Sequence, residues 1–168
     1  MKPYISIFDV YWTKTIQSLP KSFAPVMKAA TMVGQPVIMG IIIAIFDIIA
    51  LSQGLTDDVM LYSLVLVIIP FASILKIWVH RPRPMTYTRT WMPSHSFPSG
   101  HAYGSLLVLL TLAYVNASVP LFIFAILASF LIGLSRIYRG AHYPTDIIGG
   151  WIFALAAFIL AVYFRGRI

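Results

Sequence analysis

Cysteine and glutamate are both absent from this sequence, and each absence narrows the chemistry that the chain can perform. Without cysteine there is no thiolate nucleophile, no thiolate metal ligand and no disulfide framework. Acidic side chains are scarce as well, and all five are aspartates scattered along the chain: Asp9, Asp47, Asp57, Asp58 and Asp146. Because a carboxylate-bound metal needs several such groups together, we expect no metal site and no cofactor.

Charged residues are also few. Charged residues make up 10% of the chain, whereas 60% is hydrophobic and the mean hydropathy is +0.87. Soluble domains average about 25% charged residues, so this composition excludes an ordinary soluble globule and a disordered chain. The net charge of +7 indicates an anionic partner. A chain this apolar is a poor candidate for binding nucleic acid, so we expect membrane lipids, and a lipid phosphate in particular, as partners.

Long apolar stretches dominate the rest of the sequence. A helix needs about 20 mostly apolar residues to cross a bilayer, and five stretches reach or approach that length. The predicted spans are 30–51, 60–79, 101–115, 121–134 with an extension to 138, and 147–164. Asn116 and Pro120 predict a hairpin turn between the third and fourth spans rather than one long helix. We therefore predict an all-α polytopic membrane helical bundle of about five transmembrane helices.

The first 29 residues follow a different pattern. Apolar and aromatic residues recur there at three- and four-residue spacing: Ile5, Phe8, Trp12, Ile16 and Leu19. This pattern is typical of an amphipathic helix lying in the membrane interface. We predict one integral-membrane domain over 1–168, with an interfacial segment at 1–29 and a transmembrane core at 30–168.

Polar residues gather in three groups. The first lies at the end of the second predicted span and in the loop after it, and is basic: Lys76, His80, Arg81, Arg83 and Arg89. The second is Pro98–His101, before the third span. The third lies between the last two spans: Arg136, Arg139, His142 and Asp146. If successive spans alternate in direction, all three groups reach one membrane face and form a single site. Basic residues can instead simply reach toward anionic headgroups, but that alternative does not explain why three groups converge.

The second group predicts a helix N-terminus. Ser99 is a favourable N-cap, and Gly100 lets a ligand approach the backbone closely. Free amide groups and the positive end of the helix dipole then favour a bound anion. Taken alone, the segment has a plainer interpretation as an ordinary cap followed by an incidental His101.

In the third group, His142 and Asp146 are four residues apart, and Pro144 between them suits the first turn of the last helix. The carboxylate can hold one imidazole nitrogen, which fixes the tautomer and leaves the other nitrogen nucleophilic. The alternative is a structural histidine at the interface, with Asp146 complementing the helix dipole.

Asp47 stands apart from these groups. It lies inside the first predicted span, where an acidic side chain needs a partner. No residue at helical spacing supplies one, so we expect Asp47 to make a structural polar contact rather than to belong to the site.

Together, three segments resemble the signature of the type 2 phosphatidic acid phosphatase superfamily, which includes bacterial membrane lipid phosphatases, glucose-6-phosphatase and vanadium haloperoxidases. The segments are Lys76 followed after six residues by Arg83-Pro84, then Pro98-Ser99-Gly100-His101, then Ser135-Arg136 followed by His142 and Asp146. They occur in order and at the family spacing. Many bacterial members have six spans, and by this resemblance the N-terminal segment corresponds to the interfacial helix that precedes their second span.

The resemblance implies a role for each matching residue. His142 would be the nucleophile that forms a phosphohistidine, and Asp146 would orient it. His101 would be the general acid that protonates the leaving oxygen and then the base for water. The residues implied to bind the phosphoryl oxygens are Lys76, Arg83, Ser99, Gly100 and Arg136. Family members work without a metal, and phosphoryl transfer chiefly requires positioning and charge stabilisation.

The resemblance also implies a multi-pass protein of the cell (inner) membrane, with its site facing the periplasm or exterior and its C-terminus in the cytosol. We expect a lipid phosphatase, with undecaprenyl pyrophosphate as the favoured substrate by analogy. The alternatives are phosphatidylglycerol phosphate, phosphatidic acid and a lipid A phosphate. Two other classes stay open: a transporter of anionic lipid or phosphate, and a vanadate-dependent haloperoxidase. The sequence predicts no oligomeric state.

Overall fold

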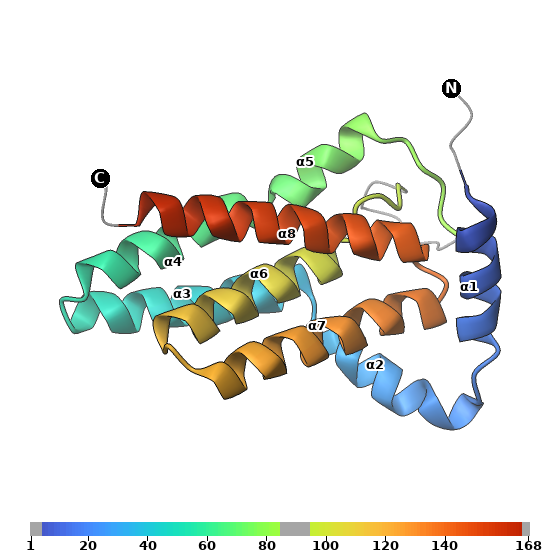
Figure 1. Ribbon diagram of the computed structural model, residues 1–168, viewed down its shortest axis with the longest axis horizontal. Helices are drawn as coiled ribbons and strands as arrows, with labels where there is room; N and C mark the ends of the chain where they lie inside the picture. Colours follow the sequence, from blue (N-terminus) through green and yellow to red (C-terminus); the bar gives the residue numbers. More distant parts are fainter. Residues whose placement is uncertain (1–4, 85–94, 166–168) are drawn as a thin grey trace.

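The computed structural model of the protein describes residues 5–84 and 95–165 (Figure 1). Every regular element in these two ranges is helical, which confirms the predicted all-α bundle. The elements are α1 (Ile7–Gln17), the 3-10 turn η1 (Lys21–Phe23), α2 (Ala24–Val33), α3 (Pro36–Ser52), α4 (Thr56–Ile68), α5 (Phe71–Trp78), α6 (Gly100–Val115), α7 (Val119–Tyr138) and α8 (Pro144–Phe164).

Length and hydropathy identify the helices that can cross a membrane. Within the described residues, Thr56–Trp78, Val119–Tyr138 and Pro144–Phe164 are each long and apolar enough to span a bilayer. The pair Lys21–Val33 and Pro36–Ser52 passes the same test together, and α6 is a shorter apolar helix of 16 residues. Apolar side chains such as Ile152 and Ile159 cover the outside of the bundle, as lipid contact requires. The chain is an integral membrane protein.

The first predicted span, 30–51, is wrong as a continuous helix. The structure breaks it at Gly34 and Gln35 and bends the two halves by 51°. Pro36 explains the break, because proline has no amide hydrogen to donate within a helix and fits its first turn instead. The predicted boundary between residues 29 and 30 also falls inside α2, so no helix end separates the interfacial segment from the core.

The second predicted span begins four residues earlier than expected and contains an interruption. Pro70 separates α4 from α5, although the two helices still form one apolar span of 23 residues. Beyond it, the predicted hairpin is confirmed: α6 ends at Val115, α7 begins at Val119, and Ser118 caps α7.

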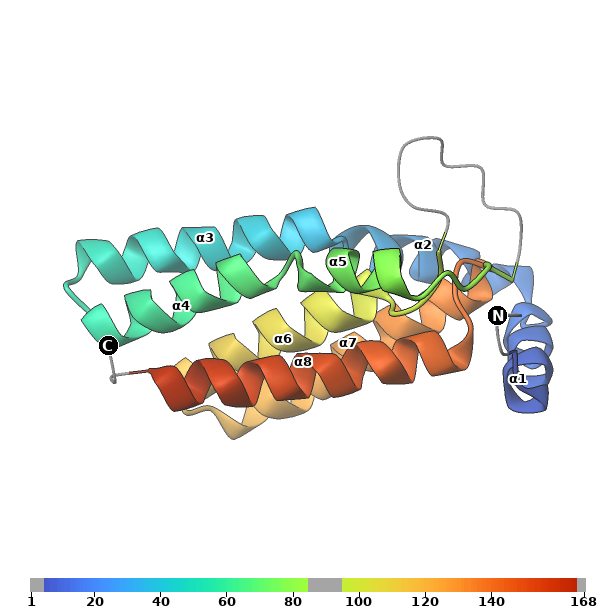
Figure 2. The same cartoon turned by 90° about the horizontal axis from the view of Figure 1, so that it is seen from above.

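Helix α6 lies at the centre of the bundle (Figure 2). It packs against α3, α4, α7 and α8, and ten of its 16 residues are buried. Hydroxyl contacts join the helices around it: the Ser105 and Ser129 hydroxyls lie 3.2 Å apart, and the Trp151 indole donates to Ser129. Such bonds avoid unsatisfied polar atoms in lipid. Asp47 makes the expected structural contact, accepting from Ser63 of α4 at 3.1 Å.

Chain direction brings four helix ends together. The end of α7 and the starts of α6 and α8 lie at one end of the bundle, and the chain leaving α5 reaches the same end (Figure 1). Helix α1 lies across this end, whereas the described chain finishes at the opposite one. The elements that carry the described residues of the three polar groups therefore meet at one end of the bundle, as alternating spans lead us to expect.

Candidate active site

The N-terminus of α6 forms one wall of the site. Ser99 is its N-cap, as predicted; the hydroxyl accepts from the Ala102 amide at 3.5 Å, and the Ser99 amide donates to the Asp146 carbonyl at 3.0 Å. A Cβ at Gly100 would lie 3.9 Å from the Lys76 ammonium nitrogen. Lys76, from the last turn of α5, therefore places its charge beside the first turn of α6.

Close approach of α8 holds this N-terminus in place. A Cβ on Gly150 would come within 2.8 Å of the Ser99 carbonyl oxygen and 3.2 Å of the Ala102 side chain. Only glycine lets the α8 backbone pass so near to the cap of α6. The spacing between the cap and the first turn of α8 is thus fixed by backbone contact.

The link from α7 to α8 carries the second histidine. Gly140 has φ +68°, a left-handed conformation that ends α7, while the Ala141 amide donates to the Arg136 carbonyl at 3.0 Å. This is the Schellman arrangement that ends many helices with a glycine. It reverses the chain within three residues, so His142 points back into the bundle end.

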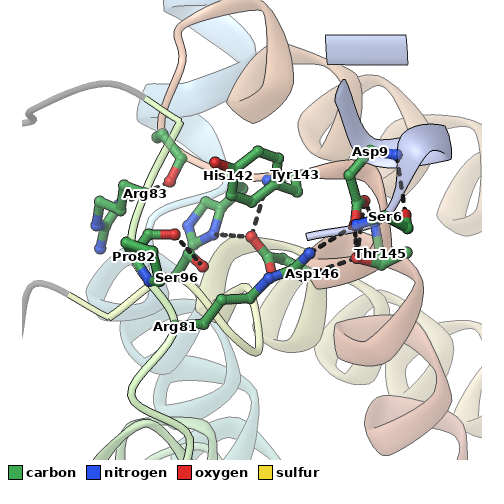
Figure 3. A network of polar contacts seen from close by, with 11 residues as sticks. Ser6, Asp9, Arg81, Pro82, Arg83, Ser96, His142, Tyr143, Thr145 and Asp146 are labelled. Atoms are coloured by element: carbon green, nitrogen blue, oxygen red, sulfur yellow. Dashed lines mark hydrogen bonds and ion pairs between the residues drawn. The ribbon is translucent and has the colours of Figure 1, made fainter. Parts of the chain in front are cut away.

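His142 and Asp146 face each other in the interior (Figure 3). Nδ1 of His142 lies 3.6 Å from Oδ2 of Asp146, and both side chains are almost fully buried. The same carboxylate oxygen accepts from the Tyr143 amide at 2.8 Å, which seats Asp146 as the third residue of a capping box. Pro144 occupies the first turn of α8, as predicted.

Three cationic residues and His101 surround this pair. Arg136 is buried in the last turn of α7, and Arg83 donates to the Ala141 carbonyl at 3.1 Å. His101 is half-buried in the first turn of α6 and lies within electrostatic range of Arg136, His142, Lys76 and Arg83. The structure therefore brings all eight predicted site residues to one end of the bundle.

The surroundings of His142 keep its imidazole neutral. Burial lowers the pKa of His142 well below its ordinary value, and the positive charges of Lys76, Arg136 and Arg83 lower it further. A backbone hydrogen bond with Ser96 opposes the shift without cancelling it. A neutral imidazole has a free lone pair, which is the form required of a nucleophile.

The basic segment after α5 is tied to the segment before α6. The Ser96 amide donates to the Arg81 carbonyl at 2.8 Å, and its hydroxyl donates to the Pro82 carbonyl at 3.1 Å (Figure 3). The rings of His80 and His95 meet edge to face, 4.6 Å apart. Arg89, which the sequence places in the same basic group, lies outside the described residues.

Sequence reasoning assigned no role to two charged residues that the structure joins to the site. Arg81 is 7% exposed and contacts both Asp146 and Asp9 of α1 (Figure 3). In the sequence, Arg81 is one of several basic residues in a loop, and nothing distinguishes it from a lipid-facing arginine. The Ser6–Asp9 spacing of a capping box was the one available signal for Asp9, and it indicates a helix start rather than a site.

The arrangement is suited to an oxyanion with several oxygens. Three cations beside a helix N-terminus lie within electrostatic range of two histidines, which are available for nucleophilic and proton-transfer roles. Among the described residues, no three His, Asp, Glu or Cys side chains come together in a way that would hold a metal ion.

Curated relatives match part of the chain. The chain is 33% identical over 105 residues to phosphatidylglycerophosphatase B of Bacillus subtilis, covering 57% of this chain and 52% of that protein. It is 30% identical over 118 residues to undecaprenyl-diphosphatase of Sulfolobus acidocaldarius, covering 68% and 49%. The chain thus spans about half the length of these two relatives.

Solved structures share the whole architecture. The transmembrane PAP2 type phosphatidylglycerolphosphate phosphatase of Bacillus subtilis superposes with a TM-score of 0.71 at 25% identity, covering 95% of this chain and 85% of that one. LpxE of Aquifex aeolicus superposes with a TM-score of 0.72 at 20% identity, covering 97% and 99%, which shows a common fold.

The family model agrees with the motifs. The model of the PAP2 superfamily matches residues 58–168, about two thirds of the chain, and this range includes all three signature segments and every predicted site residue. The chain belongs to the PAP2 superfamily, as its three signature segments indicate.

Proposed function

We propose that the protein is a membrane lipid phosphatase that hydrolyses a lipid phosphate or diphosphate through a phosphohistidine. The observation that carries this proposal is the meeting of Lys76, Arg83 and Arg136 around a buried, neutral His142 at the N-terminus of α6. Removing one of these features would leave either an anion site without a nucleophile or a histidine with nothing to hold its substrate.

In the first proposed step, the lone pair of Nε2 of His142 forms a bond to phosphorus as the bond to the leaving oxygen breaks. His101 donates a proton to that oxygen. Asp146, on the Nδ1 side of the ring, stabilises the imidazole as it gains positive charge. Lys76, Arg83, Arg136, Ser99 and the Gly100 amide hold the phosphoryl oxygens.

In the second step, His101 takes a proton from water, whose oxygen bonds to phosphorus. The nitrogen–phosphorus bond breaks and its electron pair returns to His142. Inorganic phosphate leaves, and the lipid is released as an alcohol from a monophosphate or as a monophosphate from a diphosphate. Neither step needs a metal, because positive side chains neutralise the phosphoryl oxygens.

For the substrate we propose a polyprenyl diphosphate, with undecaprenyl pyrophosphate the first candidate. The support is that one matched relative is named an undecaprenyl-diphosphatase, although another is named phosphatidylglycerophosphatase B. The experiment is phosphate release by the detergent-solubilised protein from undecaprenyl pyrophosphate, phosphatidylglycerol phosphate, phosphatidic acid and a lipid A phosphate, in excess EDTA.

We expect release in EDTA, fastest from the diphosphate. Faster phosphate release from one of the monophosphates would change the assigned substrate but leave the proposed reaction unchanged. Activity lost in EDTA and restored by a divalent ion would contradict the metal-free mechanism. Release from none of the four lipids, together with phosphate uptake into liposomes, would identify a transporter instead.

For orientation we propose that the site and α1 face the periplasm or exterior. The absence of cysteine makes this simple to test, because Ile5→Cys at the site end and Ser52→Cys at the opposite end would each carry the only thiol. An impermeant reagent added to cells should label position 5 and spare position 52. The reverse pattern would contradict the orientation.

A further inference from the structure

One buried arginine, which is not one of the matching positions of the first signature segment, lies between two carboxylates from distant parts of the chain. The Arg81 guanidinium donates from Nη2 to Asp9 at 2.5 Å and from Nη1 to Asp146 at 2.6 Å (Figure 3). Nη1 also donates to the Thr145 hydroxyl at 2.7 Å, and the guanidinium carbon lies 4.7 Å from the centre of the Tyr143 ring. Three hydrogen-bond acceptors and one aromatic ring thus fix the position and orientation of the guanidinium.

On the site side, these contacts leave Asp146 little freedom. Arg81 occupies Oδ1, and the Tyr143 amide occupies Oδ2, the oxygen that faces His142. A carboxylate bonded through both oxygens cannot rotate away from the imidazole without breaking a charge-assisted hydrogen bond.

On the other side, Asp9 is anchored as firmly as Asp146. It accepts from the Thr145 amide at 3.1 Å and hydroxyl at 2.8 Å, and from the Ser6 hydroxyl at 2.9 Å. Burial raises the pKa of Asp9, but these hydrogen bonds and the one from Arg81 outweigh it, so the net shift is downward and the carboxylate stays charged. Helix α1 is thereby fastened to the first turn of α8.

We propose that Arg81 and Asp9 are positioning residues that fix the Asp146 carboxylate toward His142, so that α1 is a working part of the active site. The proposal rests on the proposed function for the reaction that it serves. Asp9 lies outside residues 58–168, the range matched to the family. One positive charge shared by two carboxylates also explains why Asp9 and Asp146 can be buried close together.

The bundle supplies a matched control at its opposite end. Arg165 pairs with Asp58 at 2.5 Å and lies over the ring of Tyr114, with its guanidinium carbon 5.4 Å from the ring centre. This pair has the same chemistry as Arg81 with Asp9, an arginine–carboxylate bond beside an aromatic ring, but touches no site residue.

The first test compares Arg81→Met and Asp9→Asn with Arg165→Met and Asp58→Asn in the purified full-length chain. We expect the site-end changes to lower kcat about 10- to 100-fold, the usual effect of losing a residue that orients a functional side chain. KM should stay constant because the cations that bind phosphate are untouched. The far-end changes should leave both constants unaltered.

A double-mutant cycle separates positioning from general stability. If Arg81 acts through Asp146, adding Arg81→Met or Asp9→Asn to Asp146→Asn should lower kcat no further. A full additional loss in that background, or a lower unfolding temperature with unchanged kcat, would overturn the proposal. Arg81→Lys keeps the charge but not the forked geometry, so it should restore part of kcat.

A readout independent of turnover distinguishes this proposal from the proposed function. The chain has four histidines, so ¹⁵N imidazole signals can be assigned by single substitutions. We expect His142 to be neutral with its proton on Nδ1 in the unaltered protein, and a mixture of tautomers in Arg81→Met and Asp9→Asn. If the substitutions change the His142 tautomer but the protein hydrolyses no lipid, only the proposed function is refuted. If the protein is an active enzyme and the substitutions change neither the tautomer nor kcat, only the positioning role is refuted.

Discussion

The two ends of α8 each carry an arginine–aspartate pair, and the contrast between them shows what buried charge does in this bundle. At the far end, Arg165 and Asp58 have side chains 26% and 14% exposed and join α8 to α4. At the site end, the Arg81 side chain is 8% exposed and contacts two carboxylates whose side chains are exposed by 1% or less. Burying ions costs desolvation energy that their attraction barely recovers, so the buried set contributes geometry more than stability.

The same contrast extends to packing. At the site end, helix ends, caps and loops approach each other closely enough that Gly150 and Gly149 admit no side chain without displacing a neighbour. At the far end, the short turns near Gly54 and Asn116 lie open, with nothing within 4 Å of a Cβ at Gly54. The membrane-spanning middle resembles neither end, because its polar groups are few and its outer face is apolar.

The largest expected effect tests whether chemistry is confined to the site end. His142→Ala should abolish lipid phosphatase activity, lowering kcat about 10⁴-fold or more, as removal of a nucleophile does. It should also prevent trapping of a ³²P-labelled phosphoenzyme in alkaline denaturant, in which a phosphohistidine is stable. The far-end variant Asp58→Asn should retain both. A labelled, acid-labile phosphoenzyme in His142→Ala would assign the nucleophile to another residue.

The next largest expected effect tests whether His101, and not His142, is the general acid. His101→Ala should lower kcat/KM about 10²- to 10⁴-fold on a lipid alkyl phosphate, because kcat/KM reports formation of the phosphohistidine, the step in which the leaving oxygen needs a proton. On p-nitrophenyl phosphate the loss should be much smaller, because p-nitrophenolate leaves without protonation. Parallel kinetics on the two substrates measure the difference. An equal loss on both would make His101 a phosphate ligand instead of the acid.

A smaller effect tests the packing contrast. Gly150→Ala would place a methyl group 2.8 Å from the Ser99 carbonyl oxygen, so the cap of α6 must move. We expect a cost of about 1–3 kcal/mol in the free energy of unfolding, typical of overpacking, together with a lower kcat. Gly40→Ala in α3 meets nothing within 4 Å and should leave activity intact. Equal behaviour of the two variants, measured by thermal unfolding and turnover, would contradict the argument.

Part of this architecture can be predicted from the sequence, and the remainder depends on packing that the sequence pattern does not show. Hydropathy and turn residues predict the spans and the α6–α7 hairpin, since both depend on local composition. The bend before Pro36 was missed because an apolar window averages over a single proline. The three signature segments contain every catalytic candidate. Alternating helix direction explains why these segments meet at one end of the bundle.

Arg81 and Asp9 show where sequence reasoning stops. They are 72 residues apart. Their contact depends on where α1 comes to lie across the bundle end, and no periodicity encodes that. An exposed arginine at a membrane interface and a buried one between two carboxylates look identical in a sequence. Burial determines which role an arginine has, and burial is known only once the helices are packed.

The smallest expected effect follows from burial of a different group, His142. Its pKa is lowered from an ordinary value of 6.5, so below about pH 6.5 the unfolded chain binds a proton that the folded chain does not. The free energy of unfolding should therefore fall as pH drops below about 6.5, toward the lowered pKa of the folded state, whereas above about 6.5 this contribution is constant. Thermal unfolding in detergent from about pH 7.5 to about pH 5 measures the slope. His142→Gln removes one of the titrating groups and should make the decline shallower, and Gly40→Ala should reproduce the unaltered curve. An identical decline in His142→Gln would mean that the buried imidazole is not what makes folding depend on pH.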